Sequence, residues 1–146
     1  MQAEQQIKSF TLSPTVERWT AAAGVAAMAG GSAVVAYFDP AKAGFFPVCP
    51  LFALTGFACP GCGLTRGFHA LFHGDMLTAL DFNALIPIWV LIVGYAFVSL
   101  ALFAMRGRGL PMWSIVPKVL FGFMIVLILF GVLRNLPYQP FTILFP

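Results

Sequence analysis

Three long windows of mainly apolar residues set the hydrophobic pattern of the chain, at about residues 20–38, 84–105 and 115–133. A helix needs about 20 apolar residues to cross the roughly 30 Å of hydrocarbon in a membrane. We therefore expect a transmembrane helix at each of the three positions. Lys118 falls in the first turn of the third window, where its long side chain can reach the membrane interface.

The motif region between the first two windows, residues 43–83, has a different pattern. Its first part, GFFPVCPLFALTGFACP, is apolar, but Pro47, Pro50 and Pro60 interrupt it. This stretch is too short and too broken for a regular span. We expect a re-entrant or interfacial segment there, because irregular backbone at membrane depth is tolerated only where protein or water satisfies its polar groups.

The residues that follow, LTRGFHALFH, predict a short amphipathic helix. At about 100° per residue, one side is apolar and the other polar (Leu64, Phe68, Leu71 and Phe72 against Cys62, Arg66, His69 and His73). Gly61 and Gly63 give the chain a turn before this helix. Asp75 is placed to cap the next helix, and Asn83 is placed to cap the second span.

Composition indicates that lipid, rather than water, surrounds most of the protein. Hydrophobic residues make up 60% of the 146 and charged residues only 9%, whereas a soluble domain carries about 25% charged residues. We therefore expect an all-α polytopic integral membrane protein, forming a single membrane domain over residues 1–146. It has three transmembrane helices, a re-entrant or interfacial cysteine-rich segment and a short amphipathic helix.

The distribution of charge gives an orientation and excludes one class of partner. The net charge is only +3 and the basic residues are scattered, so nucleic acid is not an expected partner. Three crossings divide Lys and Arg five to three between the two faces (Lys8, Arg18, Arg106, Arg108 and Lys118 against Lys42, Arg66 and Arg134). The positive-inside rule then favours a cytoplasmic N-terminus and a motif on the outer face.

The motif has the ligand types of a metal site. Both histidines and all the cysteines lie in the motif region, which makes zinc or another transition metal a candidate cofactor (Cys49, Cys59, Cys62, His69 and His73). One unbroken helix over 62–73 would separate Cys62 from His73 by about 16 Å along its axis. A shared ion therefore needs either a break at Gly67 or a site that combines the three cysteines with His69 alone.

A thiol pair is the second interpretation of the motif. Cys59 and Cys62 flank Pro60-Gly61 at a helix start, where the helix dipole and Arg66 would favour a thiolate. They are the candidate catalytic residues of a membrane thiol-disulfide oxidoreductase. A structural disulfide explains the same spacing, with Cys49 as a resolving thiol or a bridge partner.

Anion binding and simple packing are two further interpretations. Gly61 and Gly63 let a ligand approach the backbone, and Thr65 and Arg66 suit a phosphate or a lipid headgroup. In the packing interpretation, the glycines only turn the chain, the histidines sit at the wet interface and Arg66 pairs with Asp75 or Asp81.

The stretch CPLFALTGFACPGCGLTRGFHALFHGD, followed by DFNALIP, resembles a widespread family of small bacterial membrane proteins of unknown function. The resemblance covers about residues 49–87. Where that family commonly has proline after the asparagine, this chain has Ala84 after Asn83, and its proline is Pro87. The resemblance implies a multi-pass protein of the bacterial inner membrane and supplies no activity.

Together these patterns favour a small membrane module in which the motif binds a metal ion or forms a thiol pair. We expect a role in binding or assembly rather than catalysis, within the lipid bilayer and with a second copy or another membrane protein as partner. Thiol-disulfide exchange by Cys59 and Cys62 is the main alternative, and headgroup or anion binding at Arg66 is the other.

Overall fold

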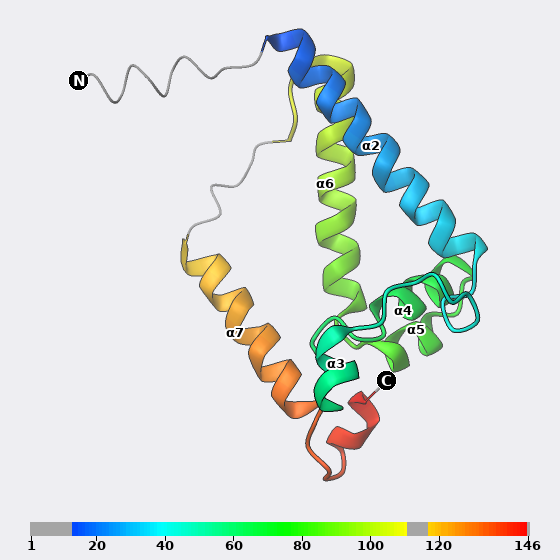
Figure 1. Ribbon diagram of the computed structural model, residues 1–146. Coiled ribbons are helices and arrows are strands. Elements are labelled where there is room, and N and C mark those ends of the chain that lie inside the picture. The colour runs from blue at the N-terminus through cyan, green and yellow to red at the C-terminus, as the bar shows by residue number, and fades with distance from the viewer. Residues whose placement is uncertain (1–12, 111–116, 146) are drawn as a thin grey trace.

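A computed structural model describes residues 13–110 and 117–145. In that part of the chain the protein is all-α, as predicted, with six α-helices and a short 3-10 helix. Three helices are long and three are short (α2 Pro14–Tyr37, α3 Pro50–Thr55, α4 Leu64–Phe72, α5 Met76–Phe82, α6 Ile86–Arg106, α7 Pro117–Leu133 and η2 Phe141–Leu144). Figure 1 shows the short helices and η2 gathered at one end of the long ones.

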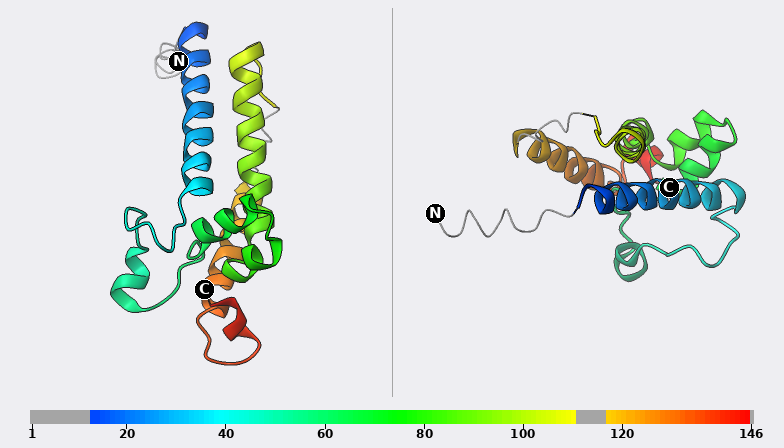
Figure 2. Two further views of the ribbon diagram at one scale, coloured as in Figure 1. Left: turned by 90° about the vertical axis from the view of Figure 1, so that its right-hand side faces the viewer. Right: turned by 90° about the horizontal axis from the view of Figure 1, so that it is seen from above.

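Helices α2 and α6 run side by side in opposite directions (Figures 1 and 2). Arg18, in the first turns of α2, ties their ends together: its Nε donates to the carbonyl of Ala104 and its Nη2 to that of Met105, each at 3.0 Å. These carbonyls belong to the last turn of α6, where no intrahelical donor remains and the helix dipole favours a cation. Gly107, with φ of 69°, then ends the helix in a left-handed turn.

Two of the predicted spans are long apolar helices. α2 and α6 have mean hydropathies of 1.4 and 2.4 over an 18-residue window, which makes both long and apolar enough to cross a membrane by length and composition. α2 begins at Pro14, before the apolar window, because Ser13 caps it by accepting from the N–H of Val16. α6 begins at Ile86, two residues after the predicted start.

The third predicted span corresponds to α7. The first two residues of the predicted window, 115 and 116, lie outside the described residues. The helix runs from Pro117 to Leu133. Its apolar part, Leu120–Leu133, is shorter than the parts that qualify α2 and α6. A crossing by α7 therefore stays a prediction.

The amphipathic helix predicted after the cysteines is α4, and it folds back on α5. Gly74, with φ of 81°, makes the turn between them. Asp75 occupies the N-cap of α5, accepting from the N–H of Thr78 at 3.0 Å and from its hydroxyl at 2.6 Å. The buried contact of this hairpin is small and involves Ala70, Ala79 and Ile86, with the apolar side of α4 packed around it.

Gly67 lies at the closest approach in this contact. A Cβ at this position would lie 2.8 Å from Cδ1 of Ile86 and 3.1 Å from the carbonyl oxygen of Ala79. The glycine therefore lets α4 approach the start of α6. It does not break the helix, because α4 continues through Gly67 from Leu64 to Phe72. The suggested break at Gly67, which would have brought both histidines to a metal, is therefore wrong.

We expect Gly67→Ala to lower the stability of the fold by about 1–3 kcal/mol, because the added methyl group overpacks the contact with Ile86 and Ala79. Thermal unfolding in detergent, followed by circular dichroism, measures the change. Gly30→Ala in α2 is the matched control, since nothing lies within 4 Å of its Cβ position. Equal unfolding midpoints for the two variants would contradict the packing described for α4.

Candidate metal and thiol site

The three cysteines come together beside the start of α4, although the first and the second are ten positions apart in the sequence. Sγ of Cys59 lies 3.3 Å from Sγ of Cys49 and 3.3 Å from Sγ of Cys62. All three sulfur atoms lie within 4.8 Å of one another. The thiols are free, with Cys62 buried and the other two half-buried. The result is one compact group of sulfur donors.

Local hydrogen bonds shape the turn that holds Cys59 and Cys62. The N–H of Cys62 donates to the carbonyl of Cys59 at 3.0 Å, and the N–H of Cys59 donates to Sγ of Cys62 at 3.2 Å. Gly63, with φ of 79°, then redirects the chain into α4, a conformation that favours glycine. Cys49 reaches the same place from the N-cap position of α3.

Asn83 holds this turn from the other side. Its side chain is 1% exposed, and its amide nitrogen donates to the carbonyls of Pro60 at 2.9 Å and Cys62 at 3.1 Å. Its Oδ1 accepts from the N–H of Leu85, and Leu85 rather than Asn83 occupies the N-cap position of α6. The predicted capping role is thus corrected: Asn83 joins the start of α6 to the cysteine turn.

Arg134, the residue after α7, is fully buried against the same turn. Its Nη1 donates to the carbonyls of Cys59 at 2.9 Å and Cys62 at 3.1 Å, and its guanidinium lies 5.0 Å from the ring centre of Phe130. Its Nε and Nη2 are buried and have no partner within the described parts of the chain. Burial lowers the pKa of Arg134, while negative charge on Cys62 and Cys59 acts in the opposite direction.

Asn135 completes the attachment of α7 to the turn. Its side chain pairs with Ala58 as a backbone strand would, accepting from the N–H of Ala58 and donating to its carbonyl, each at 2.8 Å. α7 also approaches the cysteine turn closely, since a Cβ on Gly131 would lie 3.1 Å from Cγ of Pro60. Sequence analysis missed Arg134 and Asn135 as site residues. The available signal was an ionisable residue beside an amide at the end of an apolar helix.

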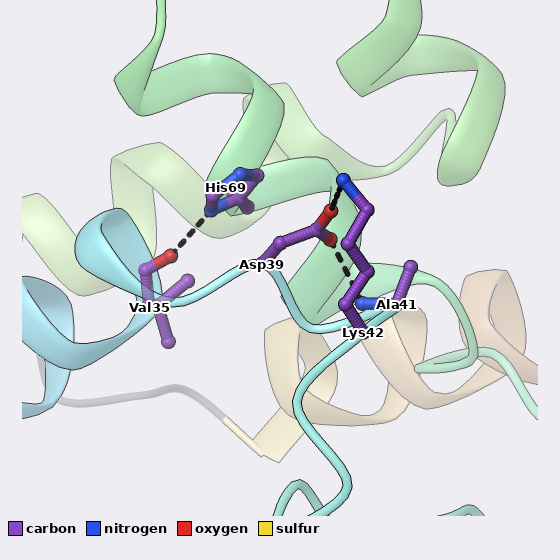
Figure 3. Close-up of polar contacts among 5 residues, drawn as sticks. All are labelled: Val35, Asp39, Ala41, Lys42 and His69. Carbon is purple, nitrogen blue, oxygen red and sulfur yellow. Dashed lines mark hydrogen bonds and ion pairs between the residues drawn. The ribbon is translucent and has the colours of Figure 1, made fainter.

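The histidines lie apart from the cysteine group. His69 places Nδ1 2.7 Å from the carbonyl oxygen of Val35, in the last turn of α2 (Figure 3). His73 places its own Nδ1 2.8 Å from the carbonyl oxygen of His69. These bonds join α4 to α2 and close the end of α4. Neither histidine shares the group of three cysteines that could hold an ion.

Beside His69, Asp39 makes an ion pair with Lys42 at 3.2 Å and accepts from the N–H of Ala41 at 2.9 Å (Figure 3). The pKa of Asp39 is lowered, chiefly by the bond from Ala41 and then by the one from Lys42. This turn leads from α2 towards α3, and it forms part of the rim of the cavity beside the cysteines.

The two anion candidates, Thr65 and Arg66, line a cavity of about 410 Å³ together with Cys49, Cys62, Gly61 and Gly63. The guanidinium of Arg66 stacks 5.2 Å from the ring centre of Phe82. The packing interpretation predicted that Arg66 pairs with Asp75 or Asp81. Among the described residues Arg66 forms neither ion pair. The lining of the cavity therefore includes two cysteines, Cys49 and Cys62, and one cationic residue, Arg66.

The pKa values of two thiols move in opposite directions. The pKa of Cys49 falls to about 7, chiefly because the backbone N–H of Phe52 donates to its sulfur and then because of the Cys59 thiol. The pKa of Cys62 rises to about 12, mainly because the thiol is buried. The thiolate is the form that binds metals and attacks disulfides. Cys49 is thus the easier thiol to deprotonate.

Comparison with known proteins gives one family match, over part of the chain, and no activity. Residues 49–97 match the family model described as a protein of unknown function (DUF2752). This agrees with the resemblance seen in the sequence over 49–87. The DUF2752 match begins at Cys49 and includes the cysteine turn, α4, α5 and the first half of α6. No curated protein and no solved structure matches the chain significantly.

We expect Arg134→Met to destabilise the fold by about 1–3 kcal/mol, because the buried carbonyls of Cys59 and Cys62 each lose one of their two donors. Thermal unfolding of the purified protein measures the loss. Arg106→Met, at the exposed end of α6, removes a charge of the same kind without touching the turn. The interpretation fails if both variants unfold at the temperature of the unsubstituted protein.

Proposed function

We propose that the chain is a single-domain protein of the bacterial inner membrane, with α2, α6 and α7 as three spans. The windows of α2 and α6 are only 6% and 0% buried, whereas a core helix of a soluble protein would be mostly buried. α7 also exposes large apolar side chains along its length, including Phe121, Ile128 and Val132. With 17 residues it spans about 25 Å, slightly less than the hydrocarbon thickness.

The orientation that we propose has the N-terminus in the cytoplasm and the cysteine group outside. Arg18 and Arg106 lie at the paired ends of α2 and α6, away from the cysteines (Figure 1). Arg108 follows in the loop after α6. A cytoplasmic location for this end agrees with the preference of Lys and Arg for cytoplasmic loops.

For the site, we propose that Cys49, Cys59 and Cys62 bind one thiophilic transition-metal ion, with zinc the first candidate. The observation that carries this proposal is the approach of all three sulfurs to within 4.8 Å. Zinc–sulfur bonds of about 2.3 Å at tetrahedral angles place sulfurs about 3.8 Å apart. The observed 3.3 Å contacts would need to open by only about half an ångström.

Charge supports the same proposal. A divalent ion with three thiolates carries one net negative charge, which is costly to bury without a partner. Arg134 supplies a buried positive charge beside Cys59 and Cys62, and two of its nitrogen atoms have no partner among the described residues. The proposed function is therefore a membrane module for metal binding or assembly, acting with a second copy or a membrane partner.

Thiol exchange is the second candidate, because Cys59 contacts both other sulfurs at the same distance. A disulfide between Cys59 and Cys62 would pass to two thiols of a partner protein. The partner would lose two electrons and two protons, and Cys59 and Cys62 would become thiols. Lipid-headgroup or anion binding at Thr65 and Arg66 is weaker as a separate function, because Arg66 stacks on Phe82.

We expect about one zinc, copper or iron ion per chain after purification in mild detergent without chelator. Cys59→Ser should lose the ion because it removes the central sulfur, whereas His73→Ala should retain it because His73 lies outside the group. Metal analysis and a free-thiol count on one sample make the measurement. If the protein contains no metal and only one free thiol, the metal proposal is wrong and two of the cysteines form a disulfide.

A membrane-impermeant maleimide tests the orientation. In spheroplasts, whose inner membrane is intact, we expect the reagent to label the metal-free protein from outside. Cys49 should react first, and faster at pH 8 than at pH 6, because its pKa is about 7 and only the thiolate reacts. Cys62, with a pKa of about 12, should react slowly at both pH values. Labelling that requires membrane disruption would place the motif in the cytoplasm instead.

A further inference from the structure

We propose that the metal ion has an open fourth position, which faces the 410 Å³ cavity and accepts a small organic thiolate. This inference rests on the proposed function and goes beyond it, because it names what the bound metal would in turn bind. It starts from the number of ligands. The described residues offer three sulfurs and no histidine or carboxylate in the same group. Closed structural zinc sites have four protein ligands, whereas sites with three keep an exchangeable position.

The cavity gives that fourth position a place to open. Two of the three cysteines, Cys49 and Cys62, form part of its wall, whereas Cys59 does not. Its volume of about 410 Å³ falls within the range of roughly 300–1,000 Å³ that small-molecule sites occupy. The turn after α2, the segment before α3 and α3 itself supply further lining residues (Pro40, Ala41, Phe46, Pro47, Val48 and Phe52). A ligand that enters the cavity would approach the side of the sulfur group formed by Cys49 and Cys62.

The walls also select the chemical class of the ligand. The ion with three thiolates is negative by one charge, and Arg134 behind the turn balances it. Arg66, in the cavity wall, then leaves a net positive charge that an anionic donor can neutralise. Soft thiolate ligands favour soft metals and soft partners, so sulfur is the preferred donor atom. Phe46 and Phe52 offer apolar surface to the organic part of the ligand.

Cobalt(II) provides the test, because its visible absorption bands report the atoms bound to it. The full-length protein is loaded with one cobalt ion per chain in detergent and titrated with 2-mercaptoethanol. We expect a saturable change in the bands, with cobalt retained on the protein. Ethylene glycol, which has the same size but no sulfur, should produce no such change.

Two variants localise the effect. Val48→Trp places a large side chain in the cavity wall, and Leu54→Trp places one on the exposed side of α3, outside the cavity. We expect Val48→Trp to weaken the thiol response by about tenfold, equivalent to about 1.4 kcal/mol. Leu54→Trp should leave the response unchanged, and both variants should still bind one cobalt ion.

The outcomes separate this inference from the proposed function. A protein that binds no cobalt overturns the metal proposal and this inference with it. A protein that binds cobalt but shows constant bands throughout the titration has a closed site, completed by a second copy or by another residue, and overturns this inference alone. Loss of cobalt to the thiol overturns it as well, as does an equal response in the two tryptophan variants.

Discussion

The attachment of the cysteine turn to the ends of two helices is the constraint on which the rest of the site depends. The turn over residues 58–62 is irregular backbone between apolar helices, so its polar groups need partners from the protein. Side chains supply them: Asn83 from before α6, and Arg134 and Asn135 from after α7. The same bonds fix α6 and α7 at this end, so the site and the helix arrangement form one unit.

This arrangement treats the three sulfurs unequally. Cys59 and Cys62 belong to the braced turn, whereas Cys49 is carried by the short helix α3, which ends at Gly56 with φ of 74°. No side-chain bond of the kind made by Asn83 or Arg134 holds α3 to the turn within the described residues, apart from the contact between Cys49 and Cys59. An ion or a disulfide joining Cys49 to the turn would therefore restrain a short helix that has no buried residue of its own.

The features that the sequence could predict depend on neighbours along the chain. Apolar windows identified α2 and α6, a 3.6-residue period identified α4, and Asp75 after Gly74 marked the start of α5. The helical spacing of Cys62 and His73 predicted that they could share an ion only if the helix broke at Gly67, and α4 is continuous there. The remaining features depend on tertiary contacts. Asn83 and Arg134 both donate to the carbonyl of Cys62, although they are about 50 residues apart in the chain. Treating Arg134 as a loop charge concealed its burial.

Arg134 also links the site to the stability of the fold. A buried guanidinium in which two nitrogen atoms have no partner among the described residues is costly when no negative charge lies nearby. Neutral thiols do not reduce the free-energy cost of burying the charge of Arg134. Thiolates bound to a metal ion would offset it, because their net charge is negative. Any ligand that binds only the folded state raises its stability, and here the bound form would also neutralise the buried cation. Residues 49–97 contain the three sulfurs, whereas Arg134 follows α7. A negatively charged metal–thiolate group at the cysteines would therefore need the end of α7 in place for its charge to be balanced.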